Sequence, residues 1–181
     1  MRHAAILAAV ALCACAPRGE SLGRTAAAPP SMMMTVQLLG PSGELRGTAR
    51  LEQETAGTRI AAVVQGLPPG AYAIHFHAVG RCDGPDFMTA GGHFNPDMKQ
   101  HGRDNPLGSH LGDLPNLTVG GDGRGRIDHV QAGLRLRDGA LALLDADGAA
   151  VMIHAGPDDY KTDPAGNAGA LIACGVLGLP K

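Results

Sequence analysis

The stretch AYAIHFHAV, residues 71–79, decides the fold of this sequence. Successive side chains of a β-strand point to opposite faces, and here the large apolar and aromatic side chains all fall on one face: Tyr72, Ile74 and Phe76. The other face carries His75 and His77, whose imidazoles point to the same place. The stretch therefore predicts a strand that packs on a core with one side and presents two histidines with the other.

The rest of the chain repeats a rhythm of short strands and turns. Glycine and proline are frequent, at 27 and 13 of 181 residues, and aromatic residues make up only 3%. No long stretch has the apolar period of a helix. Further strands are predicted at residues 35–39, 46–53, 58–65, 124–130, 149–154 and 170–177. This pattern predicts an all-β domain, a β-sandwich or barrel.

Length and charge restrict the class of protein further. A chain of 181 residues is long enough for one ordinary domain and too short for two full-sized ones. Its 15 Lys and Arg against 17 Asp and Glu give a formal charge of −2. Such a chain offers no basic field, so nucleic acid is excluded as a partner.

Two long segments, residues 81–117 and 155–169, interrupt the strand rhythm. Irregular loops of this length in a compact domain are usually functional. Six of the eight histidines lie in these segments or at the strand ends beside them: His75, His77, His93, His101, His110 and His154. With Asp113 they form a set of imidazoles and a carboxylate, which suits Zn²⁺. His129 stands apart and is predicted to be a surface residue of a strand.

The N-terminus has the pattern of an export signal. A short basic start is followed by an apolar run, residues 4–12, that is too short to span a membrane. The sequence LCAC that ends it resembles a bacterial lipoprotein processing site, with Cys15 as the lipidated first residue. We therefore expect a signal peptide at residues 1–14, a lipidated cysteine and flexible tether at 15–32, and a folded domain at 33–181. The alternative is an ordinary signal peptide cut near Ala14 or Ala16.

The processing site thus predicts an exported protein in the periplasm or cell envelope, held at a membrane by lipid on Cys15.

Two cysteines remain in the folded domain, Cys82 and Cys174. An oxidising compartment lets such a pair close, so a disulfide is expected, and two free buried thiols are the alternative. Methionines 32–34 offer soft donors for copper, but their place where tether meets domain favours packing or disorder.

Six short motifs of the chain resemble those of a known protein family. The motifs are IHFH at residues 74–77, GGHFNP at 91–96, HG at 101–102, HLGDLPN at 110–116, IHAG at 153–156, and GNAG leading to ACG at 166–175. Together they resemble the copper,zinc superoxide dismutase family in its bacterial secreted branch, over residues 33–181. The resemblance implies a Greek-key β-barrel or sandwich, immunoglobulin-like, whose two long loops build a site for one copper and one zinc per subunit.

The resemblance also implies a role for each site residue. The copper ligands would be His75, His77, His93 and His154, and the zinc ligands His93, His101, His110 and Asp113. His93 would bridge the metals and serve as proton donor. Asp158 would accept hydrogen bonds from His75 and His101, although without the resemblance it would be a solvated loop carboxylate. Cys82 and Cys174 match the family disulfide.

The implied activity is dismutation of superoxide to O₂ and H₂O₂. One position departs from the family, because Leu171 stands where the family has an arginine that docks the anion beside copper. We therefore expect reduced activity, with Lys161 either steering superoxide from a distance or simply solvated. The alternative of another class is a non-catalytic protein that sequesters or delivers copper and zinc. A domain that binds no metal would require six accidental histidines. The sequence leaves open whether the protein forms a homodimer.

Overall fold

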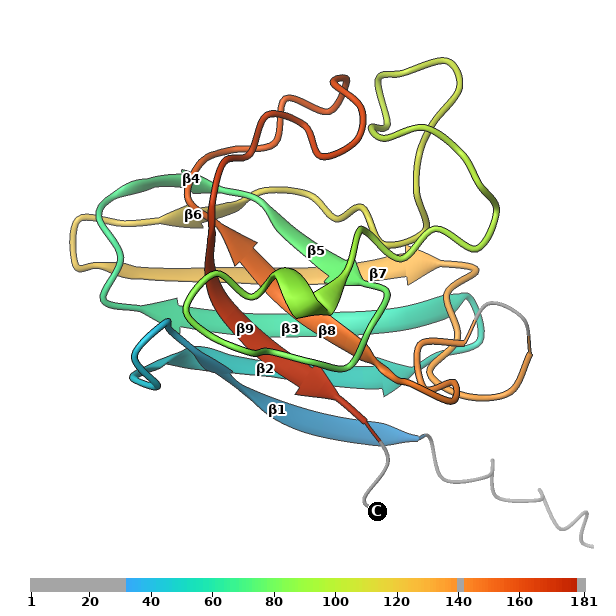
Figure 1. Ribbon diagram of the computed structural model, residues 1–181, viewed down its shortest axis with the longest axis horizontal. Coiled ribbons are helices and arrows are strands. Elements are labelled where there is room, and N and C mark those ends of the chain that lie inside the picture. The colour runs from blue at the N-terminus through green and yellow to red at the C-terminus, as the bar shows by residue number, and fades with distance from the viewer. Residues whose placement is uncertain (1–31, 140–141, 179–181) are drawn as a thin grey trace, which may run out of the picture.

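The computed structural model describes residues 32–139 and 142–178. The predicted signal peptide, Cys15 and nearly all of the predicted tether lie outside the described residues. Within these ranges the regular structure consists of β-strands and a single turn of 3-10 helix, η1, Met88–Ala90 (Figure 1). No helix in the described part of the chain is long and apolar enough to cross a membrane.

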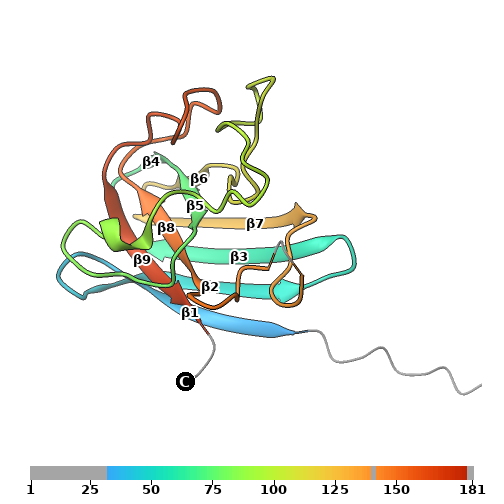
Figure 2. The same cartoon turned by 45° about the vertical axis from the view of Figure 1, so that its right-hand side comes forward.

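Within residues 32–139 and 142–178, nine strands form one antiparallel sheet. They are β1 Met33–Leu39, β2 Leu45–Gln53, β3 Gly57–Gln65, β4 Gly70–Tyr72, β5 Ile74–His77, β6 Leu117–Val119, β7 Arg124–Ala132, β8 Ala149–His154 and β9 Leu171–Leu177. Their order in the sheet is β4-β6-β7-β3-β2-β1-β9-β8-β5. β4 and β5 stand at opposite ends of this order although only Ala73 separates them in the chain. The sheet therefore curls until its two edges nearly meet, as a barrel does (Figure 2).

The connections are those of a Greek key. The hairpin β6–β7 is inserted between β3 and β4, and the hairpin β8–β9 is inserted between β1 and β5. The Ala73 amide donates to Gly156 O over 2.8 Å, and Ala73 O accepts from the His154 amide over 3.0 Å, so the pairing of β5 with β8 continues past Ile74. The predicted all-β Greek-key fold is thus confirmed.

Two details of the strand prediction were wrong. Residues 71–79 do not form one strand, because the chain changes partner at Ala73: β4 pairs with β6, and β5 pairs with β8. β6 was not predicted: it begins at Leu117, the last residue of a segment predicted to be loop, and pairs with β4 and β7. Alternation over three residues is too short a pattern to identify a strand.

The core fills the inside of the barrel. Ile74 and Phe76 of β5 are fully buried in it with Leu38, Leu51 and Ile60. The opposite face of β5 is buried as well, since His75 and His77 are 0% and 4% exposed. The long loops that follow β5 and β8 rise above one end of the barrel in both views, and the loop after β5 covers this second face (Figures 1 and 2).

Both remaining expectations for the domain are confirmed by its packing. A disulfide joins Cys82 and Cys174, with 5.7 Å between their Cα atoms, and ties the loop after β5 to β9. Met32 and Met34 pack against the core, as expected, whereas Met33 between them is exposed.

Candidate metal centre

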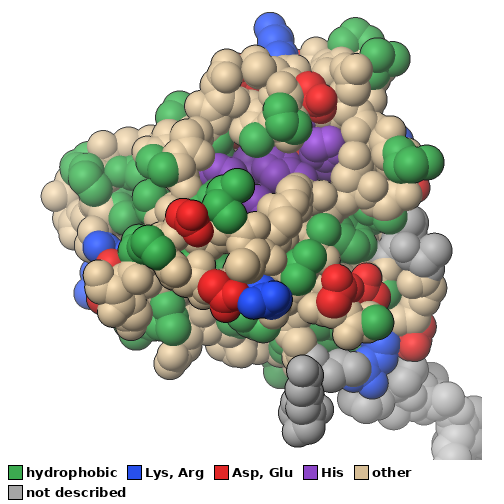
Figure 3. All heavy atoms as spheres, viewed as in Figure 1, with side chains coloured by type: hydrophobic (Ala, Val, Ile, Leu, Met, Phe, Trp, Pro, Cys, Tyr) green, Lys and Arg blue, Asp and Glu red, His purple; other side chains and the backbone are tan. Residues whose placement is uncertain are grey.

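Seven side chains of the predicted metal site come together at the end of the barrel where the loops after β5 and β8 lie. β5 supplies His75 and His77, and His154 ends β8. The loop between β5 and β6 supplies the others: His93, His101, His110 and Asp113. In the space-filling view the histidines gather in a hollow between the two loops (Figure 3).

Backbone hydrogen bonds hold the loop against the open edge of β5. The Phe94 amide donates to Phe76 O over 2.7 Å, and the Phe76 amide donates to Gly112 O over 2.9 Å. A Cβ at Gly112 would lie 2.5 Å from Phe76 O, so only glycine permits this approach. The loop thus continues the sheet beyond β5 and brings its histidines beside His75 and His77.

Asp113 is the centre of one donor set. Its Oδ1 lies 2.9 Å from His93 Nδ1, 3.1 Å from His101 Nδ1 and 3.2 Å from His110 Nδ1. Its Oδ2 accepts hydrogen bonds of 3.0 Å from the amides of Gly102 and His110. The four ligand atoms lie within 4.8 Å of one another. Three imidazole nitrogens and one carboxylate oxygen are a set that suits tetrahedral Zn²⁺.

A second donor set lies on the other side of His93: His75, His93 and His154 bring their ligand atoms within 4.8 Å of one another, and His77 lies next to this group but outside that limit. His75 Nδ1 is 3.1 Å from His154 Nε2, and the ring centroid of His77 is 5.1 Å from that of His93. Nε2 of His77 and Nε2 of His93 are buried and have no hydrogen-bond partner. Burying unpaired polar atoms costs free energy, so these nitrogens fit a bound metal ion. A set of imidazole nitrogens suits copper.

Asp158 contacts one histidine of each donor set. His75 Nε2 lies 3.0 Å from Asp158 Oδ2, and His101 Nε2 lies 2.8 Å from Asp158 Oδ1. The side chain of Asp158 is fully buried. The structure therefore places Asp158 between the two histidines that the resemblance implied as its partners. Each imidazole that donates to Asp158 through Nε2 keeps Nδ1 free for a metal ion.

Two residues without an assigned role in the sequence hold Asp158 in place. The Asn116 side chain donates to Asp158 O over 2.9 Å and accepts from the Asp158 amide over 2.8 Å. The Tyr160 amide donates to Asp158 Oδ1 over 2.7 Å, and Tyr160 Oη accepts from the Asn116 amide over 2.8 Å. Asn116 falls within the motif HLGDLPN, but nothing in the motif indicates that its amide reaches residue 158.

Burial sets the protonation of the second donor set. It lowers the pKa of His75 to about 3, and the pKa values of His77 and His154 to about 4, because charging an imidazole is costly away from water. These imidazoles are therefore neutral at neutral pH. His77 Nδ1–H donates to Gly91 O over 2.8 Å, which leaves the lone pair on Nε2.

In the first donor set, which is centred on Asp113, His101 is charged at neutral pH, unlike the neutral imidazoles of the second set. Burial lowers the pKa of His101, but hydrogen bonds to Asp113 and Asp158 outweigh it and raise this pKa to about 9. Burial raises the pKa of both carboxyl groups, but hydrogen bonds from the histidines outweigh it and hold these pKa values well below the usual range. A cation that binds His101 thus displaces a proton from the ring.

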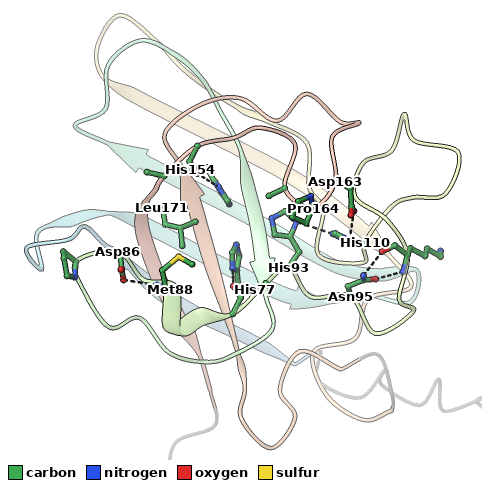
Figure 4. A pocket seen from close by; sticks show the side chains of 17 residues that line it. His77, Asp86, Met88, His93, Asn95, His110, His154, Asp163, Pro164 and Leu171 are labelled. Atoms are coloured by element: carbon green, nitrogen blue, oxygen red, sulfur yellow. Dashed lines mark hydrogen bonds and ion pairs between the residues drawn. The ribbon is translucent and has the colours of Figure 1, made fainter.

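A cavity of about 780 Å³ opens over the histidines. His77, His93, His110 and His154 line it, and Leu171 forms part of its wall (Figure 4). The charged residues of its lining are Asp86, Lys99 and Asp163. Lys161, which the sequence suggested for steering, is exposed and is not part of this lining. The cavity gives a small solute a path from the surface to the second donor set.

Comparisons with known proteins agree with this geometry. Residues 45–177 match the sequence profile of the family described as copper/zinc superoxide dismutase (SODC). The chain is 46% identical over 142 residues to superoxide dismutase [Cu-Zn] 1 of Aquifex aeolicus, covering 77% of this chain and 84% of that protein. It is 44% identical over 145 residues to the superoxide dismutase-like protein YojM of Bacillus subtilis, covering 78% and 74%.

Solved structures give the same result. The crystal structure of a SOD-like protein from Bacillus subtilis superposes with a TM-score of 0.76 at 41% identity, covering 79% of this chain and 97% of that one. The Cu/Zn superoxide dismutase of Brucella abortus superposes with a TM-score of 0.64 at 28% identity, covering 81% and 99%. The matching sequence profile, the identity to these relatives and the shared barrel lead to one conclusion: the chain belongs to the copper/zinc superoxide dismutase family.

Proposed function

We propose that this protein dismutates superoxide to O₂ and H₂O₂ with one copper and one zinc per chain. Copper would be held by the second donor set: His75, His77, His93 and His154. Zinc would be held by the first: His93, His101, His110 and Asp113. Copper supplies an ion that alternates between two oxidation states and so can accept and return one electron.

The observation that carries the proposal is the placement of His93 between the two sets. Its Nδ1 lies 2.9 Å from Asp113 Oδ1, while its buried Nε2 has no hydrogen-bond partner. A protein that only stores copper has no need for an imidazole shared with a second metal set. A ring held at one nitrogen can take up a proton at the other and pass it to the departing peroxide. His93 Nε2 is therefore the proposed proton carrier.

Asp158 has a positioning role in this proposal. By accepting hydrogen bonds from His75 and His101 it fixes the tautomer and the orientation of one ring in each donor set. Leu171 brings no charge to the wall of the cavity. A docking arginine in its place would bind the anion through charge-assisted hydrogen bonds, so we propose that this enzyme works with reduced efficiency.

The substitution Leu171→Arg is expected to raise the rate of superoxide decay by about tenfold or more, since a charged hydrogen bond contributes about 1–3 kcal/mol. Wild type and variant are compared with equal copper and zinc contents, at low and moderate salt. The gain should shrink as salt screens the new charge. Leu171→Gln is the control, because glutamine brings a long polar side chain without charge.

The second candidate function is binding of copper and zinc without catalysis, in sequestration or delivery. The uncharged Leu171 in the wall of the cavity favours it. The same experiment separates the two candidates. A wild-type rate clearly above buffer supports the enzyme, whereas full metal content with no turnover before Leu171→Arg supports the binding protein.

We also propose that the mature protein begins at a lipidated Cys15 and is anchored to a membrane outside the cytoplasm. Cys15→Ser would then leave the protein unprocessed or release it as a soluble exported form, because the acylated sulfur is absent. Fractionation of cells with an antibody to the folded domain tests this. Membrane fractionation and processing identical to wild type would contradict lipidation at this position.

A further inference from the structure

Met88 stands at the mouth of the cavity over the histidines. It is 69% exposed, yet it lines the same cavity as His77 and His154. In the close view its thioether lies toward Leu171 and His77 (Figure 4). Met88 thus lies between the exposed surface and the wall of the cavity that His77 and His154 form.

The turn that carries Met88 also fixes His77. Met88 begins η1, whose Gly91 amide donates to Met88 O over 3.1 Å. The Met88 amide donates to Asp86 Oδ1 over 3.2 Å, and Phe87 beside it is buried. Gly91 O, at the end of the same turn, accepts the 2.8 Å hydrogen bond from His77 Nδ1. Thioether and imidazole are therefore placed by one short, anchored segment.

The chemistry of this wall suits a soft cation. Thioethers prefer Cu(I) to Cu(II) and Zn²⁺, and imidazole nitrogen accepts either state of copper. His77 Nε2 is buried without a hydrogen-bond partner. The charged lining residues of the cavity are two carboxylates, Asp86 and Asp163, and one ammonium, Lys99, so their balance is negative.

We propose that Met88 Sδ, His77 Nε2 and His154 form a binding site for Cu(I) at the mouth of the cavity. The site shares His77 and His154 with the second donor set, so Met88 would hold Cu(I) at the side of that set that faces the mouth of the cavity. This inference rests on the copper assignment proposed above, but it does not require turnover of superoxide. Its test is therefore made on the full chain loaded with zinc alone, in the absence of superoxide.

Met98 provides a matched control. It is 90% exposed and follows in the same long loop, but it is not part of the lining of the cavity. Leucine has the size and apolar character of methionine and lacks the sulfur, so it preserves packing while it removes the donor. Met88→Leu is expected to weaken Cu(I) affinity about tenfold in competition with bicinchoninate, while Met98→Leu leaves it unchanged. Zinc content and melting temperature should be equal in all three proteins.

A second readout needs no variant. Ag⁺ is a redox-inert soft cation, and its titration into zinc-loaded protein with labelled methionine methyl groups should shift the Met88 methyl signal up to one equivalent. The Met98 methyl signal should stay in place. The proposal is overturned if the Met88 signal does not move, if both signals move alike, or if Met88→Leu binds Cu(I) as tightly as wild type. Failure of superoxide turnover leaves these measurements intact and so is distinguishable.

Discussion

Asp113→Ala is expected to remove zinc from the protein and to lower its melting temperature in the same measurement. Oδ1 of Asp113 faces Nδ1 of His93, His101 and His110 within 3.2 Å, so the variant loses the only anionic ligand of this set. Zinc affinity should fall at least about a thousandfold, since a charged ligand in a buried site contributes about 4 kcal/mol or more. Zinc content after dialysis against a competing chelator measures this.

Asp113→Asn separates the two roles of the carboxylate. Asparagine keeps an oxygen that can accept from the amides of Gly102 and His110, which anchor the loop, but it brings no charge. The metal-free Asn variant should therefore unfold at a higher temperature than the Ala variant and at a lower one than wild type, because it keeps the amide hydrogen bonds but loses the charge that pairs with His101. Its zinc affinity should fall nearly as far as that of the Ala variant. One zinc per chain in Asp113→Ala would show that the carboxylate is not a ligand.

The part of the site that follows from local sequence was predictable. The alternation in residues 71–79 placed His75 and His77 on one face and Ile74 on the other, and in the structure Ile74 lies in the core. This prediction needs only the geometry of a strand. The clustering of the other histidines in two loops indicated a metal site, because imidazoles rarely gather without one.

Other features depend on how distant segments meet, and local pattern does not contain that information. The predicted strand divides at Ala73 because the chain changes there from pairing with β6 to pairing with β8. Asn116 holds Asp158 across 42 residues of chain. The sequence around Met88 did not indicate a metal ligand, because its place in the cavity lining depends on how η1 packs in the folded protein.

Gly166→Ala is expected to damage both donor sets through a residue that binds no metal. The backbone of Gly166 has φ +64°, and a Cβ there would lie 1.9 Å from Asp158 Oδ1 and 2.7 Å from His101 Nε2. Asp158 has no room to yield, because Asn116 and Tyr160 hold its backbone and carboxylate. The carboxylate must therefore leave its contacts with the histidines. Loss of such outer partners costs about 10–100-fold in metal affinity.

Gly133→Ala is the control that isolates this effect. Gly133 also has a left-handed backbone, at φ +77°, but a Cβ there would meet nothing within 4 Å. Both variants carry the conformational cost of alanine in this region, about 1 kcal/mol. Only Gly166→Ala adds the displacement of Asp158, so it should lose about 3 kcal/mol or more in urea unfolding, together with zinc affinity. If both variants unfold alike and keep their zinc, then the carboxylate of Asp158 does not hold the two donor sets together.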